Sequence, residues 1–112
     1  YQLVKQGKVR FVGASNYDAA GLKAALDAAE ADGRARYDVI QPQYNLMVRD
    51  DYEGALETLC EEHKLGVIPY FALAMGFLTG KYRSEDDLSK SPRGGRMADW
   101  FTDRNMNLLD QI

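Results

Sequence analysis

The pattern of apolar and polar residues alternates between short strand-like runs and longer helix-like repeats. Residues 8–14 are rich in β-branched and aromatic side chains and lie between glycines, which predicts a short β-strand. Residues 18–31 then repeat small and apolar side chains every three or four positions, which predicts an amphipathic helix. Asn16 or Asp18 is suited to cap the start of this helix, and Gly33 is suited to end it.

The same alternation continues through the middle of the chain. Residues 37–44 predict a second strand whose ladder pairing ends near Pro42, because proline has no backbone N–H to donate. A helix is predicted from residue 50 or 51 to residue 64, with acidic residues at its start and basic residues at its end, and Gly66 is its expected stop. Residues 67–71 predict a third strand.

After the third strand the pattern changes to small residues and then to polar ones. Residues 82–104 contain many Ser, Asp, Lys, Arg and Gly side chains, which predicts a long mobile surface loop. Residues 105–112 begin another helix-type repeat. Strands separated by helices predict an α/β fold with parallel strands, but the periodicity does not distinguish an open sheet from a closed barrel.

Composition and charge favour a single globular domain. The 112 residues are 46% hydrophobic and 28% charged, with a net charge of −3 and no basic stripe, which argues against a nucleic-acid partner. The longest nearly apolar run, residues 66–78, is shorter than the roughly 20 residues that cross a bilayer, so no membrane partner is expected. The single cysteine, Cys60, excludes an internal disulfide and favours a reducing, cytoplasmic location.

Three phrases stand at the predicted strands. The first is Gly-Lys-Val-Arg-Phe-Val-Gly-Ala-Ser-Asn at residues 7–16, and the second is Gln-Pro-Gln-Tyr-Asn-Leu at residues 41–46, followed by Arg49. The third lies within residues 66–82 and includes Ile-Pro-Tyr and Gly-Phe-Leu-Thr-Gly-Lys-Tyr. In type, order and spacing these phrases resemble the fifth, sixth and seventh strands of the aldo-keto reductase barrel.

The resemblance implies a fold. Members of the family form a TIM (β/α)8 barrel of roughly 250 residues or more. Residues 1–112 are therefore expected to be part of a single barrel domain, truncated at both ends, with about three parallel strands and their helices. Three strands cannot close a barrel, and their open edges would favour self-association.

The resemblance also assigns residues to the nicotinamide end of a cofactor site. In the family, the positions of Ser15, Asn16 and Gln41 hydrogen-bond the nicotinamide carboxamide. The aromatic ring at the position of Tyr70 stacks on the nicotinamide. In the alternative interpretation, Ser15 and Asn16 only cap the next helix, Gln41 satisfies buried backbone, and Tyr70 is a core residue.

A second set of positions matches the family loop that approaches the cofactor pyrophosphate. Small residues let the backbone come close to a phosphate, and an ammonium group is attracted to its charge. Phe71 and Ala72 depart from the commoner Tyr-Ser-Pro-Leu and remove a hydroxyl, while Arg93 or Arg96 is a further candidate. For the lysine, the alternative is an ordinary solvated surface residue. The matching positions are Leu73, Ala74, Gly76, Leu78 and Lys81.

The residues that perform the family's chemistry have no counterpart in the chain. The family transfers hydride to a carbonyl with a tyrosine as proton donor, aided by a lysine, an aspartate and usually a histidine, all from the first four strands. We therefore assign no catalytic residue. His63 and Cys60 lie on a predicted outer helix and form no metal-binding set, and no GxGxxG motif occurs.

Three interpretations of function follow. The first is a section of an NAD(P)H-dependent oxidoreductase, with NADPH as the expected cofactor, that reduces small aldehydes or ketones to alcohols. The second is a non-catalytic, truncated or regulatory nucleotide-binding or assembly protein related to the potassium-channel β subunits. The long loop after Lys81 resembles both these subunits and the bacterial oxidoreductases of the family. The third is a different barrel enzyme, such as a flavin-dependent one.

Overall fold

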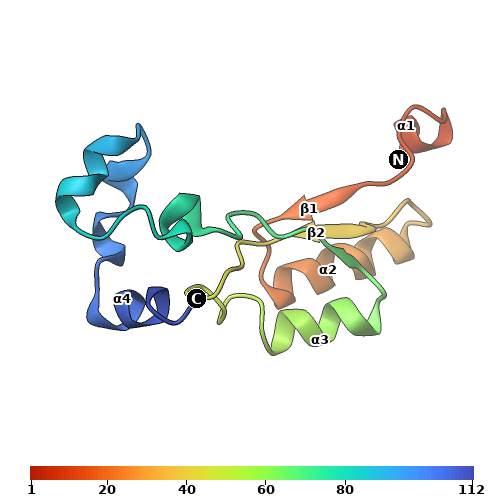
Figure 1. The fold of residues 1–112 in the computed structure, drawn as a ribbon. Coiled ribbons are helices and arrows are strands. Elements are labelled where there is room, and N and C mark those ends of the chain that lie inside the picture. The colour runs from red at the N-terminus through yellow and green to blue at the C-terminus, as the bar shows by residue number, and fades with distance from the viewer. The chain divides into compact units, whose positions relative to one another are not determined.

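The computed structural model describes residues 1–112 and divides them into two compact units, Tyr1–Tyr70 and Phe71–Ile112. Each unit is described by itself. The first contains a parallel sheet with helical crossovers, which confirms the predicted α/β class (Figure 1). The sheet is open, with three strands in the order β1-β2-β3.

The sheet of the first unit is built from short strands in a strict parallel register. The strands are β1 (Gly13–Ser15), β2 (Val39–Gln41) and β3 (Gly66–Val67). Ser15 pairs with Gln41, and Ile40 pairs with both Ala14 and Val67. A further parallel bridge joins Gln43 to Tyr70 beyond the regular strands. Pairing therefore continues past Pro42, although the regular strand ends just before it.

Two helices cover one face of this sheet. They are α2 (Ala19–Ala31) and α3 (Ala55–Glu62), while a short α1 (Gln2–Lys5) precedes the sheet (Figure 1). Because side chains alternate along a strand, one face of the sheet supplies the core and the other does not. The core cluster comprises Ala14, Leu22, Leu26, Ile40, Leu56, Leu59, Cys60 and Leu65.

The structure corrects the predicted strand bounds. Regular pairing of the first strand begins at Gly13 and not at residue 8. Just before it, the carbonyl of Val12 still accepts the N–H of Asp38 at 2.8 Å, but the N–H of Val12 donates to the carboxylate of Asp38 at 3.1 Å and not to a backbone carbonyl. The second and third strands are also shorter than residues 37–44 and 67–71. The β-propensity of a segment does not indicate where the neighbouring strand stops providing hydrogen-bond partners.

The predicted starts and ends of the helices are partly confirmed. Asp18 caps α2, with its Oδ1 accepting the N–H of Gly21 at 2.7 Å, and Gly33 with φ of 59° follows its end. Helix α3 is shorter than predicted, because Gly54 with φ of 94° interrupts the backbone before Ala55. Its end is marked by Lys64 in the left-handed region, with φ of 53°, whereas Gly66 starts β3.

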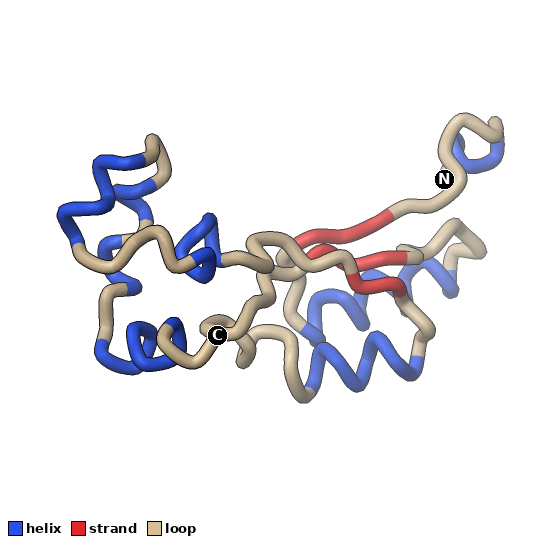
Figure 2. The backbone as a smooth tube through the Cα atoms, in the orientation of Figure 1, coloured by secondary structure: helices blue, strands red, loops and turns tan.

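The second unit contains four 3-10 turns and one short α-helix joined by irregular backbone, and its helical segments are blue in Figure 2. The turns are η1 (Ala74–Thr79), η2 (Glu85–Lys90), η3 (Gly94–Arg96) and η4 (Ala98–Trp100), and they precede α4 (Asp103–Leu109). Phe77 packs edge-on against Trp100 and Phe101, with ring centroids 6.1 and 5.3 Å away. The segment predicted as a mobile loop thus contains local turns, and its mobility stays a prediction. No helix in either unit has the length and apolar character needed to cross a bilayer.

A row of glycine, valine and glycine crosses the exposed face of the sheet. Gly13, Val39 and Gly66 are register partners. A Cβ on Gly13 would lie 2.6 Å from Cγ2 of Val39, and one on Gly66 would lie 2.9 Å from its Cγ1. The valine side chain therefore fills the space that side chains on both neighbours would otherwise need. This row lies two residues before Ser15 and Gln41 and supports the backbone from which they project.

We predict that Gly13→Ala lowers the free energy of unfolding by about 1–3 kcal/mol, because the new methyl group overlaps a side chain with a stiff χ1 angle. The measurement is urea denaturation. Val39→Ala is the matched variant, and the double variant should lose less stability than the sum of the two single changes. Strict additivity would show that the two side chains do not compete for space.

Candidate functional site

The polar residues predicted for the site lie at the carboxyl edge of the sheet, the edge at which the parallel strands end. Ser15 and Gln41 are register partners and project to the same face, opposite the helices. The side chains of Ser15, Asn16 and Gln41 are exposed, and Tyr70 is half-buried. The parallel topology thus brings together residues that are far apart in the sequence.

Hydrogen bonds tie these residues to one another. The hydroxyl of Ser15 donates to the backbone carbonyl of Gln41 at 2.9 Å, and the backbone N–H of Asn16 donates to the same oxygen at 3.3 Å. The phenolic hydroxyl of Tyr70 donates to Oδ1 of Asn16 at 2.8 Å. Asn16 has φ of 58°, a left-handed conformation that asparagine tolerates better than most residues. All four residues belong to one hydrogen-bonded arrangement.

A cavity of about 270 Å³ opens beside this arrangement. The sequence did not identify Gln43 or Tyr17 as part of it. The period-two alternation of a strand was a usable signal for Gln43, which lies two positions after Gln41. The lining residues are Asn16, Tyr17, Asp18, Pro42, Gln43, Asp51, Leu56 and Tyr70.

The rest of the second phrase holds the loop that follows β2. Oδ1 of the buried Asn45 accepts the N–H groups of Met47 and Val48 at 2.9 and 3.0 Å, which closes a tight turn. Asn45 therefore acts on the backbone of the loop, whereas Gln41 remains exposed at the carboxyl edge.

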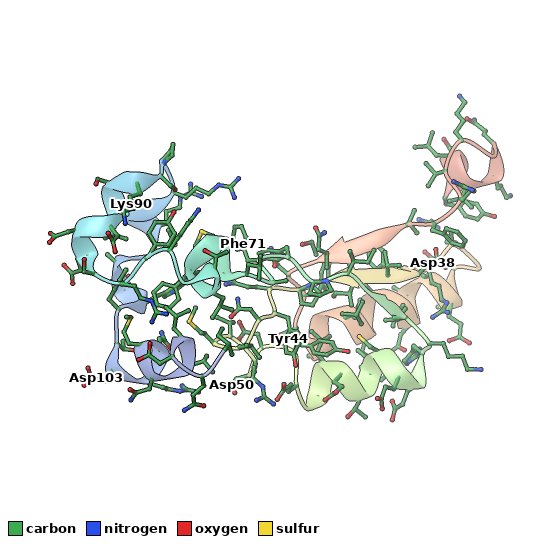
Figure 3. The ribbon with its side chains drawn as sticks, in the orientation of Figure 1. Asp38, Tyr44, Asp50, Phe71, Lys90 and Asp103 are labelled. Carbon is green, nitrogen blue, oxygen red and sulfur yellow. The ribbon has the colours of Figure 1, made fainter.

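A carboxylate clamps the same loop to the start of α3. Glu53 accepts hydrogen bonds from Arg49 at 2.6 and 3.0 Å and from the hydroxyl of Tyr44 at 2.7 Å. Tyr44 is labelled in Figure 3. The guanidinium of Arg49, with the hydroxyl of Tyr44, holds the pKa of Glu53 below its usual value. Tyr44 also packs edge-on against Tyr52, with ring centroids 5.3 Å apart. The clamp fixes the path of the chain between β2 and α3.

In the second unit, the turn assigned to pyrophosphate uses much of its backbone internally. Ala74, Met75 and Gly76 have φ of 48°, 53° and 108°, so the turn is strongly curved. The N–H groups of Ala74, Gly76 and Leu78 donate to carbonyls of Phe71 and Leu73 at 2.7 to 3.3 Å. These amides are therefore not aimed outward as a ready-made anion cradle.

The lysine of this turn is exposed. Nζ of Lys81 lies 5.0 Å from the ring centroid of Tyr82. A Cβ on Gly76 would lie 3.6 Å from this Nζ atom. The hydroxyl of Tyr82 is buried. Ser91 and then Lys81 lower the pKa of Tyr82, but neither makes a hydrogen bond of normal geometry with its hydroxyl. Lys81 is thus the clearest positive charge on the turn.

The segment after Lys81 is held at two points. Asp87 accepts the N–H groups of Arg83 and Ser84 at 2.8 and 3.2 Å and pairs with Lys90 at 2.6 Å (Figure 3). Lys90, followed by the Arg83 N–H, lowers the pKa of Asp87. Gly94 is buried against the backbone of Leu88, where an added Cβ would lie 1.7 Å from the carbonyl oxygen.

His63 and Cys60 do not enter a site. Cys60 is buried in the core of the first unit, and burial raises the pKa of its thiol. The carbonyl of His63 accepts a hydrogen bond from Arg36 at 2.9 Å. No three His, Cys, Asp or Glu side chains lie close enough together to hold a metal ion.

Comparison with known proteins identifies the family. The model of the aldo/keto reductase family matches residues 1–111. The chain belongs to this family. The family fold is a TIM barrel, of which the three-stranded sheet is an open part.

Three similar aldo/keto reductase relatives come from different organisms. An aldo-keto reductase of Babesia bovis is 36% identical over 93 residues, which are 81% of the chain and 33% of the relative. A putative voltage-gated potassium channel subunit beta of Schizosaccharomyces pombe is 33% identical over 106 residues, or 90% and 28%. The NADH-specific methylglyoxal reductase of Escherichia coli is 31% identical over 112 residues, or 99% and 31%. The chain thus spans about a third of the length of these relatives.

We predict that Gly94→Ala opens the segment after Lys81 to trypsin. An overpacking penalty of about 1–3 kcal/mol should speed cleavage between residues 83 and 97 roughly tenfold or more. Gly95→Ala is the matched control, since a Cβ there meets no atom within 4 Å. Equal cleavage of the two variants would mean that the contact with Leu88 does not order this segment.

Proposed function

We propose that this chain forms the nicotinamide-binding section of an NAD(P)H-dependent oxidoreductase that reduces small aldehydes or ketones to alcohols. The observation that carries the proposal is the gathering of Ser15, Asn16, Gln41 and Tyr70 at the carboxyl edge of the sheet. Barrel enzymes place their active sites at this edge. Membership of the aldo/keto reductase family supports the same reaction class.

The residues at the carboxyl edge fit a nicotinamide. A carboxamide needs both a hydrogen-bond donor and an acceptor, and two amide side chains and a hydroxyl offer both. The half-buried ring of Tyr70 offers an aromatic plane next to them. When bound, the reduced cofactor supplies a hydride for the carbonyl carbon. The residues of this chain bind and orient the nicotinamide and keep water from one side of its ring.

For the second unit, we propose that Lys81 contacts the cofactor pyrophosphate. An exposed ammonium group on a curved glycine turn suits a diphosphate as a point charge. Because the N–H groups of Ala74, Gly76 and Leu78 donate within the turn, Lys81 should supply more of the attraction than the backbone does. Leu73, which is 59% exposed, directly precedes the turn and places an apolar side chain beside it.

NADPH is the proposed form of the cofactor. The resemblance to the family supports this choice, and one relative bears the name of an NADH-specific enzyme, so the choice needs a direct test. Paired fluorescence titrations with NADPH and NADH would measure it. Tighter binding of NADH would overturn the preference and leave the reaction class intact.

The uncovered face of the sheet fits the proposal that the chain is one section of a whole barrel. Phe11, just before β1, and Ile68, just after β3, are apolar residues that are 70% and 53% exposed. Inward-facing side chains of a barrel pack against those of the remaining strands. Self-association through the open edges of the sheet stays a prediction, and it applies only if those strands are missing.

A second candidate function is a non-catalytic regulatory or assembly role. The similarity to a putative potassium channel subunit beta favours it. Both candidates predict cofactor binding, so binding does not separate them. The oxidation of NADPH in the presence of small aldehydes and ketones separates the two candidates, because only a reductase should consume the cofactor.

We predict that Tyr70→Ala in the full-length protein weakens cofactor binding by about 1–2 kcal/mol through loss of stacking area. Fluorescence titration with NADPH measures the change. Tyr1→Ala is the matched control, because Tyr1 is a half-exposed tyrosine at the start of the first unit and away from the carboxyl edge. Unchanged affinity of Tyr70→Ala would remove Tyr70 from the site.

We predict that Lys81→Met weakens NADPH binding by about 1–2 kcal/mol, as expected for a lost charged hydrogen bond. The remaining affinity should also depend less on salt, since one screened attraction is gone. Lys8→Met, which removes an exposed lysine before β1, should change neither quantity. An unaltered salt dependence in Lys81→Met would place the pyrophosphate elsewhere.

A further inference from the structure

One hydrogen bond at the carboxyl edge spans the whole width of the sheet. The hydroxyl of Tyr70, which follows β3, donates to Oδ1 of Asn16, which follows β1, at 2.8 Å. The two residues are 54 positions apart, and β2 lies between their strands. The side chain of Asn16 is therefore held from the far side of the sheet and not by its own loop.

In the structure this hydrogen bond defines which end of the Asn16 amide faces Tyr70 and which end faces away from it. An asparagine side chain has an oxygen that accepts and a nitrogen that donates, and the two ends are nearly equal in shape. Because Oδ1 already accepts a hydrogen bond from Tyr70, the amide is held in one of its two flipped orientations. Nδ2 makes no hydrogen bond in the structure, so its two N–H groups remain to donate.

The neighbouring serine has the opposite polarity. Its hydroxyl proton points at the carbonyl of Gln41, 2.9 Å away, so Oγ presents lone pairs to anything else that approaches. Ser15 thus accepts where Asn16 donates. A carboxamide has the complementary pair of groups, an oxygen and an amino group, side by side.

We propose that Tyr70 is a positioning residue that acts through Asn16. Its hydroxyl holds the Asn16 amide so that Nδ2 donates to the carboxamide oxygen of the nicotinamide, while Oγ of Ser15 accepts from the amino group. The inference rests on the proposed nicotinamide site. It adds that the carboxamide binds in one of two orientations that exchange its oxygen and its amino group. The hydroxyl of Tyr70, and not only its ring, selects this orientation.

The central variant is Tyr70→Phe in the full-length protein, because it keeps the ring and removes the hydroxyl. The readout is the Kd for NADPH, which should rise roughly tenfold, the factor expected for one hydrogen bond.

An analogue of the cofactor allows the contacts of the two ends of the carboxamide to be tested separately. The 3-acetylpyridine analogue of NADPH keeps the carbonyl oxygen and replaces the amino group with a methyl group. Tyr70→Phe and Asn16→Asp should weaken NADPH and the analogue by similar factors, because both changes act on the oxygen. Ser15→Ala should weaken NADPH and leave the analogue nearly unchanged.

Tyr44→Phe is the matched control. It also removes a tyrosine hydroxyl that donates within the first unit, to Glu53 at 2.7 Å. This control should leave the Kd for NADPH unchanged, so a general loosening of the fold would not imitate the effect of Tyr70→Phe.

The outcomes distinguish the inference from the proposed function. If Tyr70→Phe binds NADPH and the analogue normally while Tyr70→Ala binds them weakly, the ring stacks but the hydroxyl positions nothing, and the inference is wrong. If neither variant alters binding, the nicotinamide site itself is misplaced. If Tyr70→Phe weakens NADPH but not the analogue, Asn16 faces the amino group and the proposed polarity is overturned.

Discussion

The parallel register of the three strands is the constraint on which the rest of the first unit depends. Ala14 and Ile40 point into the core with the leucines of α2 and α3, so the residues beside them must point away from it. A slip of one residue would bury Ser15 and Gln41 and expose Ala14 and Ile40. The hydrophobic core thus decides which side chains reach the carboxyl edge.

The loops after the strands then set how those side chains are presented. Asn45 closes the turn after β2, and Glu53 ties Arg49 and Tyr44 to the start of α3. These contacts explain why the second phrase has polar residues beyond Gln41 and Gln43, which lie at or beside the carboxyl edge. The polar residues of a family phrase therefore serve two purposes, which are to direct the backbone and to meet a ligand.

Local signals predicted the order of elements and named Asp18 as one of two candidate caps. The resemblance to the family assigned Ser15, Asn16, Gln41 and Tyr70 to one site, and the parallel strands bring them to one edge of the sheet. The bounds of the strands and of α3 needed tertiary information, because side chains such as that of Asp38 replace ladder partners and Lys64 adopts a left-handed conformation. The bond between Tyr70 and Asn16 had no local signal. Neither did the contact of Gly94 with Leu88, because propensity does not tell which backbones approach each other closely.

The backbone carbonyl of Gln41 accepts from two donors of the preceding strand segment, the hydroxyl of Ser15 and the N–H of Asn16. A carbonyl oxygen has two lone pairs, so this peptide group is saturated from within the sheet. The peptide plane that follows Gln41 is consequently immobile before any ligand arrives, and most of the ordering entropy of this edge is lost during folding. Ligand binding here should then cost little further conformational entropy and leave the backbone where it already lies.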